Sequence, residues 1–196
     1  MEIVITGHTS GIGKALYDHF INNGDNVIGL SRTNGYDIEH DFDNVVTSIA
    51  GCNLFINNAY RDQQQLKLFN ALKGKVDKIV CMGSISRLYP ELIPTDYVTD
   101  KQELYNACRL HNLTPNSAPA LHLDLSFIEH TNVEANDPTS FTSDNHITFA
   151  QIISAIDYWL LNPVITNMEF KWKCTPFVRS EFERINPSLD PSRISI

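Results

Sequence analysis

A tyrosine and a lysine lie one helical turn apart in the middle of the chain, as Tyr97 and Lys101. Residues four apart share one face of a helix, so the lysine ammonium can lie near the tyrosine phenol. A phenol with its ordinary pKa of about 10 exchanges protons poorly near neutral pH, and a neighbouring cation favours the phenolate. The spacing therefore makes Tyr97 a candidate general acid or base, although the pair alone is equally compatible with a solvent-exposed helix surface.

The first apolar run leads into a turn rich in glycine, IVITGHTSGIGKAL, with glycines at Gly7, Gly11 and Gly13. A strand that enters a helix through such a turn places bare backbone N–H groups at the positive end of the helix dipole, where an anion can approach. We assign the tight turn to Gly7, the approach of a pyrophosphate to Gly11 and close packing of helix and strand to Gly13. The turn predicts a nucleotide-binding site at the first junction of strand and helix.

The second strand ends in Ser31-Arg32, and no carboxylate follows until Asp37. Proteins that bind NAD often carry an acid at this place, whereas a basic residue suits the 2′-phosphate of NADP. A guanidinium can bind phosphate through two hydrogen bonds. The sequence therefore favours NADP(H) over NAD(H), with a solvated loop arginine as the alternative interpretation of Arg32.

Short apolar runs alternate with helical patterns along the chain, which is typical of βαβ units around a buried parallel sheet. We expect strands near residues 2–6, 26–30, 36–38, 52–56, 77–83, 119–125 and 165–171. A first helix should end before Gly24, and a last helix should cover residues 147–161. Residues 129–146 predict a long loop, and 175–196 a C-terminal tail. The pattern predicts a single doubly wound Rossmann-type α/β domain over residues 1–196, with a mostly parallel central sheet.

Composition narrows the class of protein. The formal net charge of −8 argues against a broad surface for nucleic acid or anionic membranes, because such surfaces need many cations. The first strand begins by Ile3 and no run approaches a membrane span, so we expect a cytoplasmic protein. The four scattered cysteines predict reduced core thiols, and the seven histidines show no metal-ligand spacing, so no metal site is expected.

Four motifs in this order resemble those of the short-chain dehydrogenase/reductase family. They are T-G-x-x-x-G-x-G from Thr6 to Gly13, Asn57-Asn58-Ala59, the serine of CMGSIS at Ser84, and Tyr97-x-x-x-Lys101. Each motif alone is weak evidence, but their order and the thirteen residues from Ser84 to Tyr97 make the combination specific. The resemblance extends over nearly the whole chain and implies the same fold.

The resemblance implies hydride transfer between NADP(H) and a small carbonyl or alcohol substrate. Tyr97 would be the general acid in reduction and the base in oxidation, Lys101 would also hold the nicotinamide ribose, and Ser84 would bind the substrate oxygen. The implied cofactor contacts are Gly7, Thr9, Ser10, Gly11, Ile12, Gly13, Ser31, Arg32, Asp37, Ile38, Asn57, Asn58, Ala59, Tyr97, Lys101, Ile128 and Thr131. Asp41 competes with Asp37 as the acid that contacts adenine, since DIEHDF can be aligned either way.

The chain departs from the family pattern in its middle. Tyr60 stands where the family usually has glycine, and Leu125-Ser126 replaces a proline-glycine pair. Only 27 residues separate Asn57 from Ser84, which leaves out a helix that usually carries a relay asparagine and helps form the family's dimer. A homodimer or homotetramer is therefore a weak expectation, and Asn70 is interpreted as a surface residue rather than the relay.

Two other functions fit parts of the pattern. The shortened middle and Tyr60 are compatible with an NADP(H)-binding sensor or scaffold that has little or no catalysis. Nucleotide-sugar epimerases and dehydratases share the tyrosine and lysine pair, but they usually have a longer C-terminal substrate domain. The substrate itself is not indicated by any motif.

Overall fold

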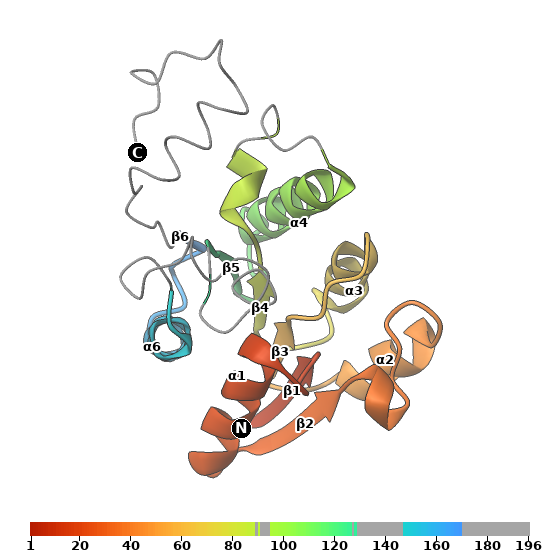
Figure 1. Cartoon of the computed structure of the whole chain (residues 1–196). Helices are drawn as coiled ribbons and strands as arrows, with labels where there is room; N and C mark the ends of the chain where they lie inside the picture. The colour runs from red at the N-terminus through yellow and green to blue at the C-terminus, as the bar shows by residue number, and fades with distance from the viewer. Residues whose placement is uncertain (89, 91–94, 127, 129–146, 170–196) are drawn as a thin grey trace, which may run out of the picture.

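A computed structural model describes residues 1–88, 90, 95–126, 128 and 147–169. It contains one sheet of six parallel strands, in the order β2-β1-β3-β4-β5-β6 (Figure 1). The strands are β1 (Glu2–Thr6), β2 (Asn26–Leu30), β3 (Leu54–Asn57), β4 (Ile79–Met82), β5 (Ala120–Asp124) and β6 (Asn167–Glu169). The α-helices are α1 (Gly11–Asn22), α2 (Phe42–Ile49), α3 (Gln64–Leu72), α4 (Asp96–Asn112) and α6 (Phe149–Leu161), and short 3-10 helices cover η1 (Arg32–Asn34) and η2 (Ile85–Leu88).

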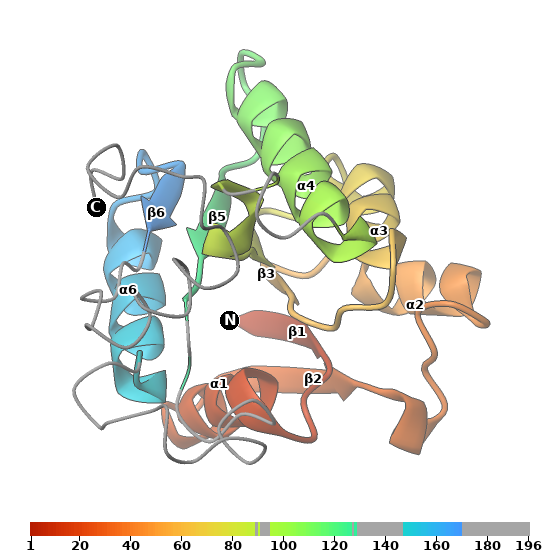
Figure 2. The same cartoon turned by 45° about the horizontal axis from the view of Figure 1, so that its top comes forward.

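Helices cover both faces of the sheet, so the strands are buried on both sides. Helices α1 and α6 lie on one face, and α2, α3 and α4 lie on the other (Figures 1 and 2). Each face has its own apolar core, one around Phe20 and Trp159 and the other around Phe55 and Phe69. Continuous apolar strands are what a parallel sheet covered on both faces requires. The doubly wound Rossmann-type architecture predicted from the sequence is confirmed.

Six of the seven predicted strands are present, and the strand expected at residues 36–38 is wrong. There the Asp37 carboxylate accepts hydrogen bonds from the backbone N–H groups of Glu39, at 2.8 Å, and His40, at 3.3 Å. An Asp side chain that bonds the backbone two residues ahead forms a turn in place of a strand ladder. The segment between η1 and α2 is therefore a loop with a turn at Asp37.

The predicted helix ends agree closely with the structure. Helix α1 stops before Gly24, which has a left-handed φ of +83°. Helix α6 begins two residues later than predicted, where Thr148 and Gln151 form a capping box. Cys52, Cys81 and Cys108 are buried and carry free thiols. No helix among the described residues is long and apolar enough to cross a bilayer.

Candidate active site

The predicted site residues come from the carboxyl ends of neighbouring strands. The glycine turn follows β1, Asn57 ends β3, and Ser84 follows β4. Helix α4 starts beside them, and the side chain of its N-cap residue Thr95 accepts a hydrogen bond from the Val98 backbone N–H. In a doubly wound sheet this edge is where ligands bind. The fold therefore gathers the four sequence motifs at one edge of the sheet.

Each of the three glycines has its own geometric reason. Gly7 has a φ of +73° and makes the tight turn, and a side chain there would also meet Asn58 and Ala59. Gly11 has a φ of +53° and no heavy atom within 4 Å of a built Cβ, so the space in front of it is open. A Cβ at Gly13 would lie 2.1 Å from the Gly7 carbonyl oxygen. Gly13 therefore allows helix and strand to pack closely, while phosphate binding at Gly11 stays a prediction.

The start of α1 presents unused hydrogen-bond donors. The backbone N–H groups of Gly11, Ile12 and Gly13 have no acceptor within the described part of the chain. The side chain of the N-cap residue, Ser10, makes no capping hydrogen bond, and both Thr9 and Ser10 are exposed. Because the helix dipole is positive at this end, the donors form a fitting cradle for a phosphate group.

The turn is packed against β2 through a histidine. A Cβ at Gly29 would lie 2.2 Å from the His8 ring, so the ring occupies the space beside this strand residue. The other side of the ring faces Tyr17, with ring centres 5.2 Å apart. Gly29 is bare because His8 packs on it.

The asparagines after β3 attach that strand to the glycine turn. The Asn58 side chain donates to the backbone oxygens of Thr6, at 3.0 Å, and Gly7, at 3.3 Å. The Thr6 hydroxyl in turn accepts from the backbone N–H groups of Asn58 and Ala59, both at 3.1 Å. Asn57 is buried and donates to the Gln65 carbonyl oxygen at 2.8 Å. Asn58 and Ala59 thus lie directly beside the proposed phosphate turn.

Arg32 lies in η1 after β2 and is exposed, with no ion pair among the described residues. Ser31 and Asn34 form a capping box that fixes the start of this short helix. The backbone N–H of Glu39 chiefly holds the pKa of Asp37 below its ordinary value. Ile38 is buried in the core, so its side chain faces away from solvent. Asp41, the N-cap residue of α2, is half-buried, and the adenine contact of Asp37 or Asp41 stays a prediction.

Ser84, Tyr97 and Lys101 converge, as the motif spacing predicts. The Lys101 Nζ lies 5.4 Å from the centre of the Tyr97 ring, and the Ser84 side chain interacts with the Tyr97 phenol. The Ser84 hydroxyl lies 2.8 Å from the Ser86 hydroxyl. Tyr97 is 37% exposed, so part of the residue is accessible to solvent.

The expected lowering of the Tyr97 pKa is wrong. Burial raises the pKa of Tyr97, and the smaller opposing influence is the Ser84 side chain. The reason lies in the direction of the lysine, whose Nζ donates to the Gln65 Oε1 at 2.7 Å and to the Met82 carbonyl oxygen at 2.8 Å. The ammonium is therefore hydrogen-bonded to Gln65 and Met82, and it lies 5.4 Å from the centre of the Tyr97 ring.

Lys101 is only 3% exposed, and burial lowers its pKa to about 8, against smaller opposing influences from Cys81, Asp100 and Asp124. An ammonium has three N–H donors, and two of them are engaged by Gln65 and Met82. One donor is left for a ligand.

Gln65 is a residue of this site that no sequence motif indicated. It is 2% exposed and shares the buried face of α3 with Leu68, Phe69 and Leu72. A polar residue at a position of an apolar helical stripe is the signal that could have found it. Asn70 is exposed, and among the described residues its side chain bonds only Lys73, which confirms it as a surface residue.

Tyr60 covers the lysine from the side of the glycine turn. Its ring packs edge to face on Tyr97, with centres 4.9 Å apart, and the Lys101 Nζ lies 4.9 Å from its centre. Its hydroxyl donates to Asp100 at 2.9 Å. Burial, followed by this hydrogen bond, raises the pKa of Tyr60. The tyrosine in place of glycine therefore narrows access to Lys101.

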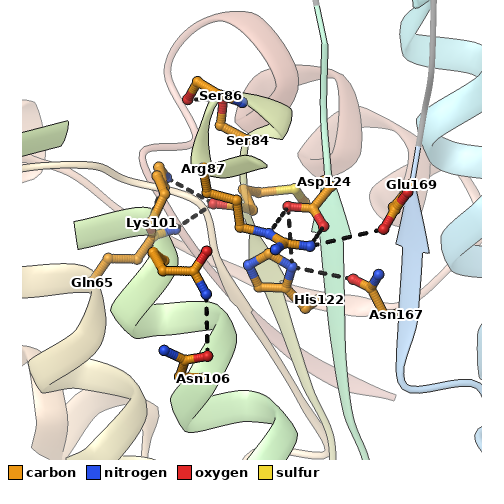
Figure 3. A network of polar contacts seen from close by, with 12 residues as sticks. Gln65, Ser84, Ser86, Arg87, Lys101, Asn106, His122, Asp124, Asn167 and Glu169 are labelled. Atoms are coloured by element: carbon orange, nitrogen blue, oxygen red, sulfur yellow. Dashed lines mark hydrogen bonds and ion pairs between the residues drawn. The ribbon is translucent and has the colours of Figure 1, made fainter. Parts of the chain in front are cut away.

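Arg87 does not face solvent, so it offers no charge to an anionic substrate. It is 5% exposed, and its guanidinium donates two hydrogen bonds to Asp124, one of them at 2.8 Å from Nε (Figure 3). Glu169 lies 3.9 Å away on β6, and the Tyr105 ring lies 3.6 Å below the guanidinium. The ion pair ties η2, which follows Ser84, to β5 and β6.

The last predicted contacts follow β5. Ile128 forms an isolated bridge with Ile147 and packs against the core. Thr131 and the loop predicted at 129–146 lie outside the described residues, as does the predicted tail. The cofactor contacts of Ile128 and Thr131 stay predictions.

No protein-family model and no curated protein matches the sequence. The chain is similar in structure to a 4-hydroxyisoleucine dehydrogenase complexed with NADH, with 17% identity, a TM-score of 0.66, and 87% of this chain and 97% of that chain covered. A short-chain dehydrogenase from Streptomyces avermitilis is 16% identical, with a TM-score of 0.64 over 96% and 94% of the two chains. A UDP-N-acetylglucosamine 4-epimerase from Bacillus cereus is 14% identical, with a TM-score of 0.61 over 94% and 84%. The chain therefore has the Rossmann-type fold of the short-chain dehydrogenases/reductases.

Proposed function

We propose that the chain is an oxidoreductase that uses a nicotinamide dinucleotide to interconvert a small carbonyl compound and its alcohol. The observation that carries the proposal is the convergence of Ser84, Tyr97 and Lys101 beside a glycine turn with open N–H donors. The dehydrogenase among the structural neighbours that is complexed with NADH supports this cofactor class.

The residues around the turn fit a dinucleotide. The free N–H groups of residues 11–13 would hold the pyrophosphate, and the remaining donor of Lys101 would hold the nicotinamide ribose. Bound in this way, the cofactor supplies or accepts the hydride. The open space in front of Gly11 is what allows the phosphate to approach the backbone.

Tyr97 would act as the proton donor to the carbonyl oxygen in reduction and as the acceptor in oxidation. The phenol is protonated at neutral pH, as the donor role requires, but its raised pKa also makes it a weaker acid than an ordinary phenol. The Ser84 hydroxyl would donate a hydrogen bond to the same oxygen, where negative charge develops. The Met82 carbonyl oxygen, which accepts from Lys101, is two residues before Ser84, so Lys101 is attached to the strand end that carries Ser84.

Within this class we favour NADP(H) over NAD(H). Arg32 is exposed and unpaired among the described residues at the end of β2, whereas the Asp37 carboxylate is already engaged by backbone N–H groups. The NADH bound to a structural neighbour is the argument for NAD(H). Titration of the wild type with NADPH and NADH decides which cofactor is preferred. An Arg32→Ala variant should lose affinity for NADPH about tenfold or more, while its affinity for NADH changes little.

The decisive experiment compares Tyr97→Phe with the wild type. The variant should bind NADPH with nearly unchanged affinity and lose turnover in a panel of carbonyl substrates, because only the phenolic hydroxyl group is removed. Full activity in Tyr97→Phe would exclude the assigned role.

The second candidate is a dinucleotide sensor or scaffold with little catalysis. The position of Tyr60 over a Lys101 that is almost fully buried favours it. Tight binding of NADPH with no oxidation by any carbonyl would support it. An epimerase shares the fold, and because 84% of the matched epimerase chain is covered, chain length no longer argues against that reaction.

A further inference from the structure

The Gln65 side chain lies where three elements of the site meet. It comes from the first turn of α3, between the ends of β3 and β4, and it faces α4. Its Nε2 donates to the Asn57 carbonyl oxygen at 2.6 Å and to the Met82 carbonyl oxygen at 3.1 Å. Its Oε1 accepts from the Lys101 Nζ at 2.7 Å (Figure 3). The amide therefore uses both its donor and its acceptor on partners from different elements.

The side chains of Asn57, Gln65 and Lys101 form one connected set of hydrogen bonds with the Met82 carbonyl oxygen. The Met82 carbonyl oxygen accepts from both Gln65 and Lys101, and the Asn57 side chain returns a hydrogen bond to the Gln65 carbonyl oxygen. A side chain with three such contacts and 2% exposure has little freedom to move. Lys101 consequently has a fixed place relative to Tyr97 and to the strand that precedes Ser84.

We propose that Gln65 is a positioning residue that fixes the Lys101 ammonium beside Tyr97 by joining it to the ends of β3 and β4. This role of Gln65 deepens the proposed function, and the effect of Gln65 on catalysis rests on that function. A neutral amide accepts from the ammonium without forming an ion pair, so the lysine keeps its charge and one donor stays available. The hydrogen bond from Lys101 to Gln65 on α3 thus orders the lysine directly, in a chain with a short segment between Asn57 and Ser84.

The charged and titratable groups that face Lys101 come from each packed element. They are Tyr60 after β3, Cys81 on β4, Tyr97 and Asp100 on α4, and Asp124 on β5. A substitution at residue 65 changes none of these groups chemically. A change in the titration of Lys101 can therefore be assigned to residue 65 itself.

The test is a direct titration of Lys101 by NMR on the full chain labelled with ε-13C lysine, with the signal assigned from Lys101→Met. A hydrogen bond to the charged form favours that form. Gln65→Met, which removes the acceptor, should therefore lower the midpoint below that of the wild type. Gln65→Glu, which places a carboxylate at the ammonium, should raise it. Opposite shifts are the expected result, because a merely structural role of residue 65 does not reverse sign.

The matched control is Gln64→Met, the same change one residue earlier on α3. Gln64 is half-buried, and its side chain makes no hydrogen bond among the described residues. The control should titrate like the wild type. If Gln65→Met does not fold, the titration midpoint of Lys101 in Gln65→Glu decides: a rise above the wild type supports the proposal, and an unchanged midpoint overturns it. Equal midpoints in the wild type and the folded Gln65 variants, or an equal shift in Gln64→Met, would overturn the proposal.

The consequence for catalysis is measured separately. Loss of a hydrogen bond to a charged group should lower kcat/KM of Gln65→Met about ten- to a hundredfold, with a smaller effect on NADPH binding. A wild type that binds neither NADPH nor NADH would refute the proposed function, whatever the titrations show. Unchanged titrations in a chain that oxidises NADPH would overturn the role of Gln65 alone.

Discussion

The buried ion pair between Arg87 and Asp124 should make a large contribution to stability that depends on both partners. The Asp124 carboxylate is 0% exposed and accepts two hydrogen bonds from the guanidinium. The variant Arg87→Met keeps much of the volume of the side chain but removes both donors. In the variant the carboxylate keeps His122 as a polar neighbour, with the His122 Nδ1 at 3.5 Å.

The expected loss follows from burial. Leaving one partner of a buried ion pair without the other costs about 3–5 kcal/mol. A domain of this kind has a free energy of unfolding of about 5–15 kcal/mol, so the loss is a substantial fraction of the total. Replacing both partners by apolar side chains leaves no buried charge, and Arg87→Met combined with Asp124→Leu should therefore lose much less than the sum of the single variants.

The assay is urea unfolding at pH 7 of the wild type, both single variants and the double variant. Arg61→Met is the matched control, because Arg61 donates to Glu39 at the same distance of 2.8 Å but at the surface. An exposed pair contributes less than about 1 kcal/mol, so the control should unfold almost like the wild type. Losses below about 1 kcal/mol in Arg87→Met, or strict additivity in the double variant, would refute the reasoning.

The same pair predicts a loss of stability in acid. Burial acts to raise the pKa of Asp124, but hydrogen bonds from His122 and Arg87 outweigh it and lower the pKa overall. The unfolded chain then binds more protons than the folded chain as the pH falls. The contribution of Asp124 is present above its ordinary pKa of about 3.9 and disappears as the pH falls through its folded pKa.

Three further variants test other parts of the structure. Gly13→Ala would place a methyl group 2.1 Å from the Gly7 carbonyl oxygen, so its free energy of unfolding in urea should fall by about 1–3 kcal/mol and most of its dinucleotide affinity should be lost. The control Gly74→Ala, where the added methyl group meets open space, should keep both its stability and its affinity. Tyr60→Phe removes the donor to the buried Asp100 and should lose about 1–3 kcal/mol, and an unchanged unfolding midpoint would contradict this hydrogen bond. Because the pKa of Lys101 falls from 10.5 to about 8 on folding, the wild type should gain stability between these pH values, and Lys101→Met should lack that part of the gain.

Much of the fold was predictable because it is encoded locally. Each strand of a parallel sheet covered on both faces is a short apolar run, and the turns between them contain glycine, proline or polar residues. The exception at residues 36–38 shows the limit of this argument. Tyr36 and Ile38 suggest a strand, but the Asp37 side chain accepts hydrogen bonds from the backbone N–H groups of Glu39 and His40, and no propensity scale includes that competition.

The site was predictable to the extent that its residues carry a spacing. The glycine turn and the step from Tyr97 to Lys101 are local patterns, so the sequence indicates them. The contact between Gln65 and Lys101 joins residues 36 positions apart, and the pair of Arg87 and Asp124 joins residues 37 apart. Such pairs depend on how strands are ordered in the sheet, which no window of sequence contains.

The contact between His8 and Gly29 has a consequence for how this protein can evolve. The imidazole occupies the volume that a side chain on β2 would need. Residues 8 and 29 should therefore covary among homologues, with a bulky residue at 8 accompanied by glycine at 29, and a small residue at 8 accompanied by alanine or valine at 29. Residue 29 precedes Arg32, the residue proposed to set cofactor preference, by three positions. A change at residue 8 would therefore restrict which residues are allowed close to Arg32.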